Sequence, residues 1–506
     1  MVNLSAQIRF HALRSPDRLA LVYEDQRIGY ADFDDRIRAM AGWLQARGVT
    51  QDQVVAVLMK NSAAFLEIAF AVSHVGAVFL PINFRLAADE VGYIVGNAGA
   101  VLLFVDEELL DSAGGEAPRV AVAAAAQRDS RAISGAAPRA QIVPRAPNDL
   151  FRLMYTSGTT DRPKGVMHVY ENFYWKCSDQ IAALGLSADD RLLVVGPLYH
   201  VGAFDLPGVA LFDLGGALFV MRDFEPGPAL AAIERERITC AWFAPVMAGM
   251  LLAHEGRERF DLSSFRWCIG GGERTPEGRI RAFTGLFRNA RYIDGYGLTE
   301  TCGGDTLMEP GREIDRIGST GRALAHVEVT IRDGEGRVLP PGTEGEICLR
   351  GPKVMRGYWK DPEKTKASFF GDWFRSGDVG YLDDEGFLYL TDRKKDMIIS
   401  GGENIASSEV ERVVYQLPQV AECAVIGLPD ERWGERPVAV VVLRPGAQLT
   451  QAELEAHCRQ YLAGFKVPRQ LILREALPRN PSGKVLKRTL RDELGAAADN
   501  GNGETS

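Results

Sequence analysis

Short apolar segments that alternate with longer helical patterns restrict the fold class of this chain most strongly. In the first two-thirds of the sequence the apolar runs lack polar alternation, which is typical of strands buried on both faces. Helical patterns separate them, for example at residues 62–75 and 228–237. The predicted strands are residues 54–59, 77–82, 100–105, 191–197, 217–221, 240–246 and 265–270. We therefore predict an α/β fold whose large N-terminal domain holds two doubly wound sheets.

The sequence pattern changes near residue 332. From there, Asp-Gly, Glu-Gly and Pro-Gly pairs, which favour turns, separate short segments in which apolar and polar residues alternate. This pattern predicts a small β-rich subdomain at about residues 328–394. A charged run, DRKKD at 392–396, precedes a compact α+β pattern. We predict an N-terminal domain at 1–394, a small mobile α+β C-terminal domain at 395–494, and a disordered tail at 495–506, because the tail is small and polar.

Composition excludes several classes of protein. The length of 506 residues is too great for one ordinary domain, and the net charge of -9 argues against a nucleic-acid partner. The seven cysteines form no C-x-x-C pair, which suits reduced thiols rather than a disulfide framework. The N-terminus lacks a basic region followed by an apolar run, and no apolar run reaches the roughly 18–20 residues that span a bilayer. We expect a cytoplasmic protein without a transmembrane segment.

A loop at residues 155–166, YTSGTTDRPKGV, has the composition of a phosphate-binding turn. Hydroxyl groups surround one glycine, and Lys164 with Gly165 closes the segment. The residues of the turn are Thr156, Ser157, Gly158, Thr159 and Thr160. Backbone N–H groups and hydroxyls in such a turn form an anion nest, to which the lysine adds a positive charge. The spacing differs from the G-x-x-x-x-G-K-[ST] loop, so a P-loop NTPase is disfavoured, and a polar surface loop is the alternative.

Nine further motifs follow or precede this loop in a fixed order. With it, they are 76–86 (GAVFLPINFRL), 155–166, 197–200 (PLYH), 270–273 (GGGE), 296–300 (YGLTE), 345–351 (GEICLRG), 375–380 (RSGDVG), 392–405 (DRKKDMIISGGENI), 430–435 (DERWGE) and 478–484 (PRNPSGK). Together they resemble the adenylate-forming superfamily of acyl-CoA synthetases, peptide-synthetase adenylation domains and firefly luciferase. The chain is most similar to fatty-acyl- and aryl-acyl-CoA synthetases.

This resemblance implies that ATP activates a carboxylic acid to an acyl-adenylate, which then passes its acyl group to coenzyme A with release of AMP and pyrophosphate. It implies Mg²⁺ held by Glu300, Thr299 at the α-phosphate, and Lys484 between the carboxylate and that phosphate. His200 is a candidate catalytic or gating residue, with simple packing as the alternative. The implied ATP-binding residues are Thr156, Ser157, Gly158, Thr159, Thr160, Lys164, Gly271, Gly272, Glu273, Asp294, Gly295, Tyr296, Gly297, Thr299, Asp378, Arg393 and Lys484.

The second half-reaction is implied to involve rotation of the C-terminal domain about Lys395. Gly401 and Gly402 would let the pantetheine arm of CoA pass close to the backbone. Trp433 would face CoA, with domain packing as the alternative. A homodimer is a further expectation from the resemblance.

The predicted acyl pocket is apolar and rich in glycine. Its expected walls are Tyr199, His200, Phe204, Phe243, Ala244, Val246, Gly270, Gly295 and Gly303. Ala244 replaces an aspartate that binds the α-amino group in peptide-synthetase domains, so an α-amino acid is disfavoured. A fatty, aryl or bulky polycyclic acid would each fit. The alternatives are an acyl-AMP ligase that delivers to a carrier protein, a luciferase-like adenylating oxygenase, and a non-catalytic nucleotide-binding scaffold.

Overall fold

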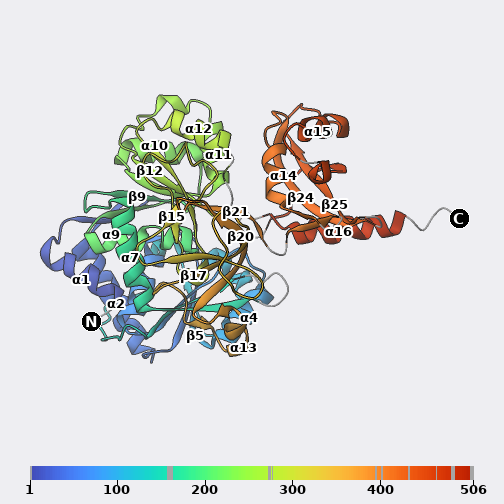
Figure 1. Ribbon diagram of the computed structural model, residues 1–506. Helices are drawn as coiled ribbons and strands as arrows, with labels where there is room; N and C mark the ends of the chain where they lie inside the picture. Colours follow the sequence, from blue (N-terminus) through green and yellow to red (C-terminus); the bar gives the residue numbers. More distant parts are fainter. Residues whose placement is uncertain are drawn as a thin grey trace. The chain divides into compact units, whose positions relative to one another are not determined.

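The structure is a computed structural model that describes residues 3–156, 163–271, 275, 277–393, 396–400, 403–430, 433–462, 464–479 and 485–501 (Figure 1). For residues 392–393, 403–404, 434 and 496–501 only the backbone is described. The chain divides into two compact units. Unit 1 contains residues 1–329 and 349–374, and unit 2 contains residues 330–348 and 375–506. The predicted domain boundary at 394/395 falls outside the described residues and stays a prediction.

Two large sheets organise unit 1. The seven-stranded sheet has the order β18-β8-β7-β4-β3-β5-β6, with parallel pairing from β7 to β6. Its strands are β3 (Val54–Leu58), β4 (Val78–Pro81), β5 (Ala100–Asp106), β6 (Arg119–Val122), β7 (Leu150–Thr156), β8 (Lys164–Val169) and β18 (Gly357–Tyr358). β8 pairs antiparallel with both β7 and β18. The β-branched and apolar residues of β3 are buried at every position, as a strand covered on both faces requires.

The nine-stranded sheet has the order β15-β14-β13-β12-β11-β9-β10-β1-β2. Its strands are β1 (Leu19–Tyr23), β2 (Gln26–Gly29), β9 (Arg191–Val194), β10 (Ala217–Val220), β11 (Cys240–Phe243), β12 (Trp267–Gly270), β13 (Arg291–Tyr296), β14 (Thr306–Leu307) and β15 (Arg322–Ala323). The strands from β1 to β13 pair in parallel, and the strands beyond each end pair antiparallel.

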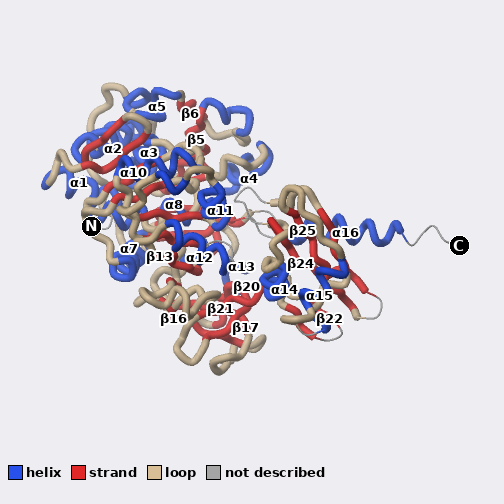
Figure 2. The backbone as a smooth tube through the Cα atoms, turned by 90° about the horizontal axis from the view of Figure 1, so that it is seen from above, coloured by secondary structure: helices blue, strands red, loops and turns tan. Residues whose placement is uncertain are grey.

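Helices cover the sheets of unit 1 (Figure 2). They are α1 (Leu4–Arg14), α2 (Tyr30–Ala46), α3 (Ala63–His74), α4 (Ala88–Ala98), α5 (Ala124–Arg128), α6 (Arg131–Ser134), α7 (Tyr170–Leu184), α8 (Val201–Phe204), α9 (Gly208–Leu214), α10 (Pro226–Glu236), α11 (Pro245–Ala253), α12 (Glu277–Leu286) and α13 (Pro362–Ala367), with 3₁₀ turns η1 (Glu107–Ser112), η2 (Arg257–Arg259) and η3 (Thr299–Thr301). Every residue of α3 is buried, and α3 contacts both β4 and β1. This helix therefore packs between the two sheets, as a helix buried on all sides must.

The two remaining sheets are shorter. Strands β16 (Glu328–Arg332), β17 (Gly345–Arg350), β20 (Trp373–Leu382) and β19 (Phe369–Phe370) lie in that order, and β21 (Leu388–Arg393) pairs with β20. The last sheet has the order β23-β22-β25-β24 with β26 beside β25, built from β22 (Ile398–Ser400), β23 (Glu403–Ile405), β24 (Val420–Asp430), β25 (Gly434–Leu443) and β26 (Gln470–Leu473). Its helices are α14 (Ser407–Val414), α15 (Gln451–Cys458) and α16 (Lys487–Gly501), with η4 (Gly464–Lys466). The predicted fold class is confirmed.

The packing of α2 gives a test of the fold. A Cβ atom at Gly42 would lie 1.7 Å from the carbonyl oxygen of Pro138, a backbone atom that has little freedom to move. We expect Gly42→Ala to lower the free energy of unfolding by about 1–3 kcal/mol, the usual cost of overpacking. Gly96→Ala is the matched control, because Gly96 also lies in a helix but has open space at its Cβ. It should be neutral or raise stability by about 0.5–1 kcal/mol. Urea unfolding midpoints measure both, and a Gly42→Ala midpoint at or above wild type contradicts the packing.

Candidate active site

The carboxyl ends of three parallel strands meet at one edge of the nine-stranded sheet. Phe243 of β11 pairs with Gly270 of β12, which pairs with Asp294 of β13. The next residue of each strand segment, Ala244, Gly271 or Gly295, therefore lies at the same height along the edge of the sheet. Ligands of doubly wound sheets bind at such an edge. The structure thus brings together the predicted adenine-site segments that it describes.

Glycines at this edge allow backbone segments to approach closely. A Cβ atom at Gly270 would lie 2.0 Å from the hydroxyl oxygen of Tyr292, and one at Gly297 would lie 2.2 Å from the backbone nitrogen of Gly304. Tyr296, the predicted adenine platform, is buried, and its carbonyl oxygen accepts a hydrogen bond from the backbone N–H of Asp305 at 2.7 Å. Gly297 therefore sets the spacing between Tyr296 and the 303–304 segment.

Asp294, the predicted partner of the adenine amino group, is buried at the end of β13. Its Oδ1 accepts a hydrogen bond from the backbone N–H of Gly295 at 3.1 Å. That bond fixes the carboxylate beside the strand end. A contact between Asp294 and adenine stays a prediction.

The predicted phosphate loop connects β7 and β8, an antiparallel hairpin. Thr156 and Lys164 are cross-strand partners at its end. Gly165, the next residue, lies against Tyr155 and Trp359: a Cβ atom there would lie 3.0 Å from the tyrosine ring. The hairpin thus places Thr156 and Lys164 on either side of the loop. The other predicted residues of the loop, Ser157, Gly158, Thr159 and Thr160, lie outside the described residues.

The segment that carries Thr299 and Glu300 is held by polar contacts on several sides. The hydroxyl of Tyr358 donates to Oε1 of Glu300 at 2.9 Å, and the N–H of Met355 donates to the Glu300 carbonyl at 2.7 Å. Nε2 of His168 lies 2.7 Å from the carbonyl oxygen of Thr299. Thr301 donates to the carboxylate of Asp305. Both predicted residues are partly exposed, so their side chains are accessible from solvent.

The donor set around Glu300 fits Mg²⁺. Its carboxylate and the adjacent Thr299 hydroxyl are hard oxygen donors. Within the described ranges, no cluster of three or more His, Cys, Asp or Glu side chains could hold a metal ion. A single carboxylate matches Mg²⁺, which proteins often bind through one or two carboxylates together with substrate phosphates. Glu300 would hold the ion, whose chemistry is to neutralise phosphate charge.

Asp378 and Arg393, the predicted ribose contacts, are cross-strand partners in β20 and β21 of unit 2. Asp378 is buried, and its N–H donates to the hydroxyl of Ser376 at 3.0 Å, across a turn in which Gly377 has φ +73°. This register supports the prediction that the two residues act at one place.

Several predicted residues lie outside the described ones. They are Gly272, Glu273, Lys395, Gly401, Gly402 and Lys484. Trp433, the predicted CoA contact, is 42% exposed, and its backbone N–H donates to Oδ1 of Asp430 at 3.0 Å. Roles in CoA binding and hinge motion stay predictions.

The predicted acyl pocket contains side chains with different environments. Tyr199 is buried with its ring at 5.4 Å from that of Phe84. His200 caps α8, where its Nδ1 accepts from the N–H of Gly202 at 3.0 Å; burial lowers the pKa of its imidazole. The ring is therefore neutral with its proton on Nε2. Val246 lies on α11 and is exposed, whereas Gly303 has φ +72° and packs on Val201.

Two predicted pocket walls are core residues in this structure. Phe243 stacks on Phe265 within a buried cluster, and the ring of Phe204 lies 6.0 Å from that of Phe79. Successive residues of a strand face opposite sides of a sheet, so the pocket side of β11 is taken by Trp242 instead of Phe243.

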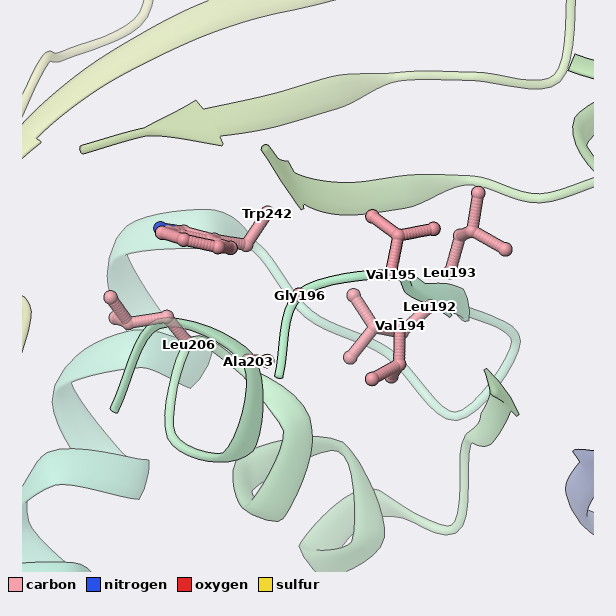
Figure 3. Close-up of a pocket in the computed structure, with 8 residues that line it drawn as sticks. All are labelled: Leu192, Leu193, Val194, Val195, Gly196, Ala203, Leu206 and Trp242. Atoms are coloured by element: carbon pink, nitrogen blue, oxygen red, sulfur yellow. The ribbon is translucent and has the colours of Figure 1, made fainter. Parts of the chain in front are cut away.

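Trp242 lies in a cradle formed by two glycines, Gly196, which is labelled in Figure 3, and Gly202. A Cβ atom at Gly196 would lie 2.6 Å from Cζ3 of the indole, and one at Gly202 would lie 2.6 Å from Cζ2. The indole borders a shallow apolar hollow that is too narrow to hold a water molecule. The residues around the hollow are Leu192, Leu193, Val194, Val195, Gly196, Ala203, Leu206 and Trp242. His200 lies beside the indole, with ring centroids 6.2 Å apart.

Comparisons with known proteins agree with the fold. The AMP-binding enzyme family model matches residues 8–359, and the AMP-binding enzyme C-terminal domain model matches residues 409–484. A feruloyl-CoA synthase of Amycolatopsis sp is 38% identical over 96% of this chain and 97% of its own. The long-chain-fatty-acid–CoA ligase FadD13 of Mycobacterium tuberculosis is 36% identical over 98% and 99%.

A solved structure gives the same result. The O-succinylbenzoate coenzyme A synthetase MenE of Bacillus subtilis, in complex with ATP and magnesium, has a TM-score of 0.86 and 30% identity. The match covers 96% of this chain and 99% of that one. The chain belongs to the AMP-binding enzyme family, the adenylate-forming superfamily. It is an AMP-forming acid–CoA ligase that uses ATP with Mg²⁺ and coenzyme A. None of the helices within the described ranges has the length and apolar character needed to cross a bilayer.

The bond from Tyr358 to Glu300 gives a test of the site. Burial raises the pKa of the Tyr358 hydroxyl, and Glu300 raises it further, so it stays a donor. We expect Tyr358→Phe to raise the KM for Mg·ATP by about 10-fold, the lower range for loss of a group that orients a metal ligand. Tyr30→Phe is the matched control, since it also removes a buried tyrosine hydrogen bond, at 2.7 Å to Gly216, away from Glu300. An unchanged KM in Tyr358→Phe, with folding intact, would show that this bond does not orient Glu300.

Proposed function

We propose that the substrate is a carboxylic acid with a planar aromatic ring, which the enzyme converts to its acyl-adenylate and then to its CoA thioester. The observation that carries this proposal is the position of Trp242 in its glycine cradle. Its indole offers a flat aromatic face beside His200, and aromatic faces favour the stacking of another ring. This proposal selects the aryl class from the fatty, aryl and polycyclic acids that the sequence allows.

The volume beyond the indole supports an aryl acid over a long acyl chain. The apolar residues beside the indole leave no space that would hold a water-sized group, so no open channel for a long chain lies there. A long chain would need to displace Trp242, which backbone at Gly196 and Gly202 holds from two sides. An aromatic ring of the substrate that ends against the indole could bind without displacing Trp242.

The electrostatics of the pocket support an acid without an amino group. Ala244, the residue in place of an amino-binding aspartate, caps α11 and has no charged side chain. His200 is neutral because burial lowers its pKa. An ammonium group placed here would lose its water without gaining a counter-charge among these residues.

The roles proposed for the nucleotide site come from the family resemblance, and the described positions of Thr156, Lys164, Thr299 and Glu300 support them. Thr156 and Lys164 would flank the β- and γ-phosphates, Thr299 would contact the α-phosphate, and Glu300 would hold Mg²⁺. Lys484 would bridge the carboxylate and the α-phosphate while pyrophosphate leaves. Asp378 and Arg393 would bind the ribose.

The relatives support an aromatic substrate without deciding it. The feruloyl-CoA synthase is named for an aromatic acid, and FadD13 is named for long-chain fatty acids. The enzyme should therefore be assayed with both classes, together with ATP, Mg²⁺ and CoA, by measuring AMP release and thioester. Thioester from arylpropenoic acids at higher kcat/KM than from fatty acids is the expected result. A preference for long fatty acids refutes the aryl proposal. A homodimer and a cytoplasmic location stay predictions.

Truncation of Trp242 tests the proposed pocket floor. We expect Trp242→Ala to lower kcat/KM for the aryl acid by about 10- to 100-fold, the range for lost apolar contact in a substrate pocket. The same variant should raise kcat/KM for medium-chain fatty acids, because the removed indole opens the hollow. Trp242→Phe keeps an aromatic face and should keep the aryl preference. If Trp242→Ala leaves the ratio of aryl to fatty activity unchanged, Trp242 does not set substrate class.

Replacement of Lys484 tests the division of labour between half-reactions. We expect Lys484→Ala to slow adenylation by about 100-fold or more, because its charge is needed where charge develops. Thioester formation from supplied acyl-adenylate should change little. Pyrophosphate exchange and thioester formation measure the two steps separately. Equal losses in both would refute the role proposed for Lys484.

A further inference from the structure

Behind Thr299 lies a fully buried group of charged side chains. Arg152 donates two hydrogen bonds to Asp205, at 3.2 and 2.7 Å, and Lys176 donates to the same carboxylate at 3.1 Å. The side chains of all three are 0% exposed, as is His168. The rings of Phe173 and Phe204 lie 4.7 and 5.7 Å from the Arg152 guanidinium carbon. Each charge in such a group needs its partners, because the removal of one would leave another charge buried and uncompensated. The side chains are therefore held in this arrangement.

The hydrogen bonds of His168 have a defined direction. Nε and a terminal nitrogen of Arg152 lie 3.0 and 2.9 Å from Nδ1 of His168. A guanidinium only donates, so Nδ1 is the acceptor and the proton of the neutral ring is on Nε2. That N–H donates to the carbonyl oxygen of Thr299 at 2.7 Å. Burial, with a smaller effect of Arg152, lowers the pKa of His168 to about 3, so the ring does not exchange protons at working pH.

The same group reaches the acyl pocket. Asp205 directly follows α8, the helix that His200 caps, and is fully buried. The next residue, Leu206, packs on Gly304 so closely that a Cβ atom at Gly304 would lie 2.7 Å from its Cδ2. A continuous path of contacts therefore runs from α8 through Asp205, Arg152 and His168 to Thr299.

We propose that His168 is a positioning residue for the adenylation half-reaction, which fixes the Thr299 carbonyl so that Thr299 and Glu300 face Mg·ATP. Arg152 and Asp205 fix the ring of His168 in turn. The inference rests on the roles proposed for Thr299 and Glu300. It assigns His168 no contact with substrate and no proton transfer. Only a group that accepts on one side and donates on the other can join Arg152 to a carbonyl, and a rigid imidazole does so at fixed length.

Three replacements of His168 separate positioning from packing. His168→Gln can place an amide N–H near the position of Nε2, whereas His168→Asn is too short to reach Thr299, and His168→Ala removes both bonds. His74→Gln is the matched control. His74 is likewise buried in unit 1 and likewise bonds a backbone carbonyl through Nε2, at 3.2 Å to Ala140, but it lies outside the Thr299 contacts.

Each variant is assayed in two steps: pyrophosphate exchange over a range of Mg·ATP, and thioester formation from supplied acyl-adenylate and CoA. We expect His168→Ala and His168→Asn to lower kcat/KM for Mg·ATP by about 10- to 100-fold, as the loss of a group that orients a metal ligand does. His168→Gln should recover most of this loss. Thioester formation serves as the measure of folded enzyme and should be retained. His74→Gln should lower the melting temperature without separating the two steps.

Glu300→Gln distinguishes failure of this inference from failure of the site. If Glu300→Gln abolishes pyrophosphate exchange but His168→Ala does not reduce it, the roles of Thr299 and Glu300 stand and the inference about His168 is refuted. If Glu300→Gln has no effect, the proposed site and the inference both fail. Equal losses of both steps in His168→Ala, without recovery in His168→Gln, would show a structural role alone and also refute the inference.

Discussion

The pairing register of β11, β12 and β13 determines where the chemistry of this protein takes place. A shift of one residue in a strand exchanges the side chains on its two faces. In the observed register Trp242 faces the glycines of the pocket and Phe243 faces the core, while Gly270 and Asp294 end at one level. The opposite register would place Phe243 against these glycines and the indole in the core. The substrate pocket and the nucleotide site therefore depend on the same backbone hydrogen bonds.

The loop after β13 forms hydrogen bonds that link the two large sheets. The loop itself follows a strand of the nine-stranded sheet, but its partners His168 and Tyr358 lie on β8 and β18 of the seven-stranded sheet. Each sheet alone could position only half of this arrangement. The adenylation site is thus held where two separately formed hydrogen-bond ladders meet, which explains why its motifs are spread over a long stretch of sequence.

The sequence predicted those features that depend on local pattern. Apolar runs identified the strands, and the chemistry of the 155–166 and 296–300 segments identified a nucleotide site whose described members lie on a hairpin end and on a sheet edge. His168 and Tyr358 were missed because their roles depend on partners far away in the chain. A histidine within an apolar run looks like any core residue. The same limit explains Phe204 and Phe243, which were placed in the pocket by proximity in sequence, although side-chain direction decides their environment.

The cradle around Trp242 has a consequence for the history of the sequence. Since the indole fills the space that a side chain at Gly196 or Gly202 would need, neither glycine can change first while residue 242 is large. A smaller residue at 242 must come before, or together with, a larger one at 196 or 202. Substitutions at these three positions, which lie on three separate segments, are therefore coupled to one another. Descendants of this chain that acquire new substrates through this wall are expected to change at these positions jointly, in a restricted order.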